Sequence, residues 1–142
     1  MSRRNRDLPK PARNVAHGIH TAKSFSEGIR LADFTDGGGT AGTYQMQFDI
    51  PQDALVLGCR VSVPEAFAGD TSAVITIGDG TDVDRYNTGT PSVFATSAGI
   101  DMGEVSGTEF HTADATPVVT VTSASDFGAI TGGGLVVTIL YI

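Results

Sequence analysis

The sequence predicts an all-β protein: a single β-sandwich or jelly roll of about eight strands with an extended N-terminal arm. Short segments in which apolar and polar residues alternate recur along the chain, and residues typical of turns separate them. No segment shows the apolar period of an amphipathic helix over ten residues. Glycine accounts for 18 of the 142 residues and only 18% of the residues are charged, a composition that disfavours helices. A chain of this length can bury a core as one domain.

The chain is predicted to begin with an extended arm. Pro9 and Pro11 exclude a helix in residues 1–14, and this segment has too few apolar residues to fold alone. Gly28 marks a possible bulge in the second of the candidate strands that follow, and residues 36–42 form a glycine-rich loop before the third. In chain order, the candidate strands are residues 15–23, 25–34, 44–49, 55–63, 73–78, 92–96, 117–123 and 135–142.

Two of these strands show a regular alternation that predicts which side chains are buried. In the first, Tyr44, Met46 and Phe48 alternate with polar residues, and Pro51 follows the strand. Pro64 is predicted to end the second, because proline cannot donate to a ladder. The predicted buried face of this second strand consists of Leu55, Leu57, Cys59, Val61 and Val63.

The C-terminal segment 135–142 is apolar on both faces. Such a strand must be covered twice, once by the core of its own sandwich and once by something else. We therefore expect it to contribute to an interface between copies of the chain. At eight residues it is too short to cross a bilayer, and we expect no membrane partner. The predicted interface residues are Leu135, Val137, Ile139 and Tyr141.

The net charge of −7 divides unevenly along the chain and suggests two parts, an arm of residues 1–23 and a sandwich of residues 24–142. The first part carries six basic residues and one carboxylate, a net +5, whereas the second carries three arginines and fifteen carboxylates, a net −12. An acidic body argues against nucleic acid as a partner, whereas a basic arm favours an anionic protein surface. The residues expected to anchor the arm are Arg3, Arg4, Arg6, Lys10 and Arg13.

Three carboxylates in Asp79–Asp84 present the type of oxygen ligand that Ca²⁺ binds, but their spacing departs from that of a calcium-binding loop. We expect a turn without metal here, in which Arg85 neutralises one carboxylate. Zinc is also disfavoured, because a zinc site needs three or four ligands and Cys59 is the only thiol. His17 and His20 would lie on opposite faces of a strand, and His111 is distant in sequence.

No pattern in the sequence is typical of catalysis. The chain has no nucleophile elbow, no ordered Ser, His and Asp signature and no phosphate-binding glycine loop. We therefore expect no catalytic residues, no metal and no cofactor, and a protein that is not an enzyme.

Several segments resemble the small β-sandwich proteins that decorate the heads of tailed bacteriophages. Residues 74–86, Val-Ile-Thr-Ile-Gly-Asp-Gly-Thr-Asp-Val-Asp-Arg-Tyr, are similar to a strand that ends in a Gly-Asp turn before Asp-Arg and an aromatic residue. Residues 54–67 resemble the preceding strand, and Phe67-Ala-Gly69 resembles its corner. Residues 112–114, 118–122 and 133–142 resemble the closing segments, so that the likeness spans about residues 43–142.

This resemblance implies a structural virion protein, a decoration or cement protein on the exterior of the capsid. It implies a jelly-roll or sandwich homotrimer whose partners are the major capsid protein and other copies of itself. The family carries no catalytic residues. Two alternatives remain: a head-fibre or tail module that binds a receptor or carbohydrate, and, less favoured, a small hydrolytic domain. The low aromatic content, 7%, weighs against a carbohydrate-binding face.

Overall fold

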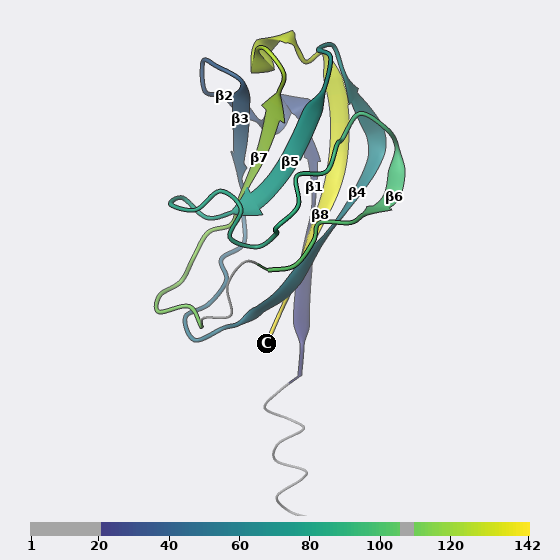
Figure 1. Ribbon diagram of the computed structural model, residues 1–142. Coiled ribbons are helices and arrows are strands. Elements are labelled where there is room, and N and C mark those ends of the chain that lie inside the picture. Colours follow the sequence, from purple (N-terminus) through teal and green to yellow (C-terminus); the bar gives the residue numbers. More distant parts are fainter. Residues whose placement is uncertain (1–20, 106–109) are drawn as a thin grey trace, which may run out of the picture.

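The protein is a sandwich of two antiparallel sheets, which confirms the predicted all-β class (Figure 1). The computed structural model describes residues 21–105 and 110–142. In spatial order, sheet A consists of β1 (Lys23–Arg30), β8 (Gly132–Tyr141), β4 (Val56–Ala68) and β6 (Ser97–Ile100). Sheet B consists of β2 (Thr35–Asp36), β3 (Ala41–Gln45), β7 (Val118–Ser123) and β5 (Ala73–Gly78). Two short 3-10 turns, η2 (Leu31–Asp33) and η3 (Phe127–Ala129), complete the described elements.

The core lies between the two sheets and follows from the period of two along each strand. Alternate residues point inward, so each strand contributes one row of apolar side chains. The central strands of both sheets supply most of it. Its fully buried members include Ile29, Val61, Val63, Ile75, Ile77, Val93, Val119, Val121, Leu135, Val137 and Ile139.

The predicted buried face of Tyr44, Met46 and Phe48 is confirmed. Met46 is 3% exposed, and the Phe48 ring stacks on Phe25 of β1 with ring centroids 3.6 Å apart. Strand β3 ends at Gln45, but the inward and outward alternation continues to Ile50, which is fully buried. The alternation of apolar and polar residues therefore predicts which side chains are buried even beyond the last hydrogen-bonded residue of β3.

The predicted buried face of the β4 segment is wrong in its first half. Val56 pairs with Tyr141 and Gly58 with Leu140, so β4 advances two residues where β8 advances one. The extra residue, Leu57, forms a bulge and is 50% exposed, whereas Val56 is buried. A bulge exchanges the faces of the residues on either side of it. The inward set is therefore Ala54 and Val56 before the bulge and Cys59, Val61 and Val63 after it, with Leu55 half-buried beside the strand.

Pro64 does not end the strand as predicted. Strand β4 continues to Ala68, and its register against β8 shifts twice, between Ser62 and Glu65 and again between Glu65 and Ala68. Proline is tolerated inside a sheet where a bulge interrupts the ladder. Beyond it, Phe67 returns to the core and its ring packs against Gly133, which has a φ of 148° and where a Cβ would clash with that ring.

The remaining predicted elements differ in their limits. The expected strand at residues 92–96 is replaced by a single bridge from Ser92 to Val74, and the ordered strand of this region is β6. Gly28 pairs regularly with Val136 and is not bulged. The candidate strand 15–23 lies almost wholly outside the described residues, and Lys23 is already the first residue of β1. Within the described residues, no helix is long and apolar enough to cross a membrane.

Candidate functional site

The Asp79 turn that follows β5 uses its carboxylate internally. Asp79 Oδ1 accepts hydrogen bonds from the backbone N–H of Thr81 and Asp82 at 2.9 and 2.8 Å, and from the Thr81 hydroxyl at 2.9 Å. Arg85 Nη1 lies 2.8 Å from Oδ2. Burial opposes the charge, but these bonds prevail and lower the pKa of Asp79 to about 2. The turn is held by its own charged pair. Arg85 neutralises one carboxylate, as the sequence predicted, and the structure shows that it is Asp79.

The histidine considered as a zinc ligand lies in the core. His111 is 4% exposed, with Nε2 2.7 Å from the Tyr86 hydroxyl and Nδ1 3.0 Å from the Ala54 carbonyl. A neutral imidazole that donates from Nδ1 and accepts at Nε2 satisfies both contacts. Burial raises the pKa of Tyr86 to about 12, so its hydroxyl stays protonated as the donor. His17 and His20 lie outside the described residues. No group of three His, Cys, Asp or Glu side chains in residues 21–105 and 110–142 is placed to bind a metal.

Glu27 joins the two sheets at their β1 and β3 edge, a role that the sequence did not reveal. Its side chain points inward from β1, where Oε1 accepts from the Tyr44 hydroxyl and Oε2 from the backbone N–H of Gln47, both at 2.8 Å. The bond from Glu27 raises the pKa of Tyr44 to about 12. A charged side chain turned inward on an edge strand also discourages unwanted strand pairing. The only sequence signal was an acidic residue at an inward position of β1.

The four residues expected to form an interface, Leu135, Val137, Ile139 and Tyr141, are buried in the core of a single chain. The opposite face of β8 carries Val136, Thr138 and Leu140, and Leu140 is 38% exposed. An interface through this strand would therefore use the face opposite to the one that the sequence analysis named. The arm residues Arg3, Arg4, Arg6, Lys10 and Arg13 lie outside the described residues.

The outer face of sheet A combines short side chains with two exposed leucines. It is built from short side chains on the central strands, and the Ser26 hydroxyl lies 2.6 Å from that of Thr138. Leu57 and Leu140 form an exposed apolar pair at one end of it. From that end, its cross-strand rows are Ser24, Leu140 and Gly58; Ser26, Thr138 and Arg60; Gly28, Val136 and Ser62; and Arg30, Gly134 and Glu65.

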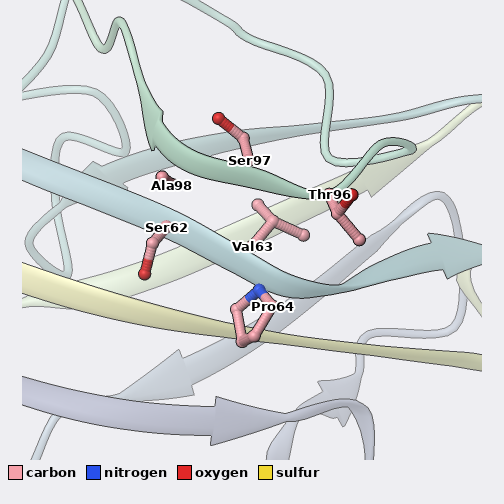
Figure 2. Close-up of a pocket in the computed structure, with 6 residues that line it drawn as sticks. All are labelled: Ser62, Val63, Pro64, Thr96, Ser97 and Ala98. Carbon is pink, nitrogen blue, oxygen red and sulfur yellow. The ribbon is translucent and has the colours of Figure 1, made fainter.

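Two shallow hollows flank Pro64 on this face. One, of about 500 Å³, lies between β4 and the start of β6, and Figure 2 shows Ser62, Val63 and Pro64 of β4 beside Thr96, Ser97 and Ala98. The other, of about 660 Å³, is lined by β1, β4 and β8, with Arg30, Asp33 and Glu65 as its charged residues. Among its lining residues, neither hollow brings together a nucleophile and a base.

Comparison with solved structures places the same fold in a virus particle. The chain superposes on one in the structure titled "Cyanophage Pam1 capsid asymmetric unit" with a TM-score of 0.57 and 17% identity, covering 85% of this chain and 84% of that one. A chain from the "Acidic stable capsid structure of Helicobacter pylori bacteriophage KHP30" aligns with a TM-score of 0.46 and 14% identity, covering 85% and 92%. No known protein family and no curated protein sequence matches the chain. At 17% identity, the likeness to the cyanophage chain shows a shared fold.

Proposed function

We propose that the protein is a structural component of a bacteriophage virion, a decoration or cement protein that binds the outer surface of the head and stabilises it. The observation that carries the proposal is the fold shared with a chain of a cyanophage capsid over more than four fifths of both chains. Two polar clusters of the described residues have structural roles: Asp79 and Arg85 hold a turn, and Tyr86 and His111 contact each other in the core. The proposed partners are the major capsid protein and further copies of this chain in a homotrimer.

The basic N-terminal arm is the proposed anchor. The arm carries a net +5 and the rest of the chain −12, so the acidic bodies would repel one another and any acidic shell without a local source of positive charge. Arginine can also grip carboxylates in a bidentate way. Pro9 and Pro11 restrict the segment to extended conformations, which reduces the entropy lost on docking.

Deletion of residues 2–14 tests the anchor. The truncated protein should remain a folded, soluble oligomer but should no longer co-sediment with purified heads. Full-length protein should bind heads more weakly as salt rises, because exposed charges are screened beyond about 8–10 Å at physiological ionic strength. A variant of unchanged length with Arg3, Arg4, Arg6, Lys10 and Arg13 replaced by glutamine separates the charge from the reach of the arm.

Unchanged affinity and salt dependence of the truncated protein would place the contact on the sandwich and reject the anchoring role. A glycan array distinguishes the alternative class, since a carbohydrate-binding fibre or tail module should bind sugars and leave heads undecorated.

A further inference from the structure

We propose that the outer face of sheet A contacts a second copy of this chain, and that it meets the acidic end of that copy formed by Asp36, Asp70 and Asp126. The proposal names the surfaces through which copies would meet in the proposed homotrimer. It rests on the proposed function only for that oligomeric state. The argument uses the charges, the apolar residues and the shape of the face, and then the position of the complementary end.

Positive charge in the described residues is concentrated on sheet A. Of the four described lysines and arginines, Arg30 and Arg60 lie on the outer rows of β1 and β4. Lys23 pairs with Tyr141 in the inward row of β1, and Arg85 is bound by Asp79. Among the described residues, Glu65 is the only carboxylate carried outward by a strand of this sheet, since Glu27 points inward. Arg30 and Arg60 balance Glu65 and Asp33, which line the adjoining hollow or the outer rows. The face is therefore nearly neutral on an otherwise acidic body, and an acidic surface can approach it.

The same face also carries two apolar side chains, Leu57 and Leu140, that are partly exposed to solvent. Leu57 and Leu140 are two of the four large hydrophobic side chains exposed in the described chain, and Leu140 pairs with Gly58, the residue after Leu57. The bulge in β4 is what turns Leu57 outward. Exposed apolar residues that gather on one face mark a contact surface more strongly than the same residues scattered singly.

The side chains of this face are also short enough for another chain to approach its backbone closely. No atom lies within 4 Å of the position that a Cβ would take at Gly28 or Gly58, so the space above both residues is open. Ser24, Ser26 and Ser62 continue the run of short side chains. Three strands about 4.8 Å apart and about ten residues long offer roughly 500 Å² in projection, against about 800 Å² per partner in a standard interface. Neighbouring segments must add to the contact.

The acidic end supplies the complementary charge. Asp36 and Asp126 lie on either side of Gly128, within 3.4 Å of where its Cβ would be, and Asp70 accepts a 2.9 Å bond from the backbone N–H of Ser125. The opposite end, which carries Asp49, Asp53 and Asp114, is where β1 begins and Ile142 bonds to Leu55. Among the described residues, no lysine or arginine lies on β2, β3 or η3 at the end formed by Asp36, Asp70 and Asp126.

The positions of the two surfaces suit a small ring. The outer face of sheet A and the end that carries η3 lie on adjacent sides of the sandwich rather than on opposite sides (Figure 1). A head-to-tail contact between different surfaces produces a ring when the rotation closes and a filament when it does not. Adjacent surfaces turn each copy relative to the last, which favours closure.

Sedimentation velocity of full-length variants tests the proposal without heads. Arg60→Asp and Leu57→Ser should each weaken self-association about tenfold or more, as expected when a favourable contact becomes repulsive or loses its apolar anchor. The matched control is Thr43→Asp with Gln45→Glu, which changes the net charge by the same amount as Arg60→Asp on the exposed face of sheet B and should leave association unchanged. Adding Asp126→Arg to Arg60→Asp should restore association, and circular dichroism establishes that each variant is folded.

Self-association that is indifferent to Arg60→Asp and Leu57→Ser, or a chain that is monomeric at every concentration, would overturn the proposal. Failure of Asp126→Arg to restore association would overturn the assignment of the acidic end. Neither result depends on head binding, which the arm deletion measures separately, so the virion role and the self-contact stand or fall by different experiments.

Discussion

Asp79 shows how a residue that resembles a cation ligand can instead hold a turn. Its side chain is 10% exposed and receives four hydrogen bonds, one of them from Arg85. The sequence indicated both the turn and the neighbouring cation. It did not indicate the burial, because burial depends on how the turn packs against the sandwich.

Replacing Asp79 by asparagine should lower the free energy of unfolding at pH 7 by about 1–2 kcal/mol. The pKa of Asp79 in the folded protein, about 2, lies below its ordinary value of 3.8. The charge therefore stabilises the fold fully above that ordinary value, and the stabilisation disappears as pH falls toward 2. Urea unfolding at a series of pH values should show the wild type and Asp79→Asn converging at low pH.

Glu104→Gln is the control, because it removes the same charge from an exposed site and should change stability by no more than about 0.5 kcal/mol. A constant difference between Asp79→Asn and the wild type at every pH would mean that the carboxylate acts by shape rather than by charge.

At the scale of the element, the β4 bulge decides which residues are core. Val56 and Leu57 are adjacent aliphatic residues with opposite environments, one buried and one half-exposed. Val56→Ala should cost about 2 kcal/mol of stability, whereas Leu57→Ala should stay within about 0.5 kcal/mol. Denaturant unfolding of both variants, at protein concentrations below self-association, measures the difference. A larger loss at Leu57 than at Val56 would restore the unbulged alternation that the sequence predicted.

The sequence could place most of the strands but not every face. The polar residues between Tyr44, Met46 and Phe48 showed which face of that segment is buried. In β4 and β8, apolar residues stand at consecutive positions, so the sequence does not show which of them point inward. Only the register of β8 against β4 shows that Leu57 is extra. The same ambiguity placed Leu135, Val137, Ile139 and Tyr141 at an interface, although within one chain they are core. The sequence could not predict the outer face of sheet A, because each of its rows combines residues from segments that are distant in sequence.

At the scale of the whole molecule, the fold is completed by its last strand. β8 lies between β1 and β4, and Lys23 pairs with Tyr141, so the first and last described strands of the chain are neighbours. Pairings between residues so distant in sequence slow folding. Stopped-flow refolding should take milliseconds to seconds, and a chain that ends at residue 131 should not fold.

Removing residues 132–142 takes the neighbour from β1 and from one edge of β4, which exposes both inward rows. Deleting residues 2–14 leaves every described pairing in place and should not alter the refolding rate. Sub-millisecond refolding of the full chain would show that long-range pairing does not limit the rate.

The nearness of Lys23 to Tyr141 also fixes where foreign sequence can be attached. Both lie at one end of the sandwich, and the glycine loop between β2 and β3 lies at the other (Figure 1). If the arm holds that first end against a head, a fluorophore or antigen fused after Ile142 would be crowded beneath the sandwich. The same cargo inserted at Gly38 or Gly39, where no atom lies within 4 Å of a Cβ position, would point away from the particle. The backbone N–H of Gly38 donates to Asp36 Oδ1, so an insertion there would also disturb the proposed contact between copies.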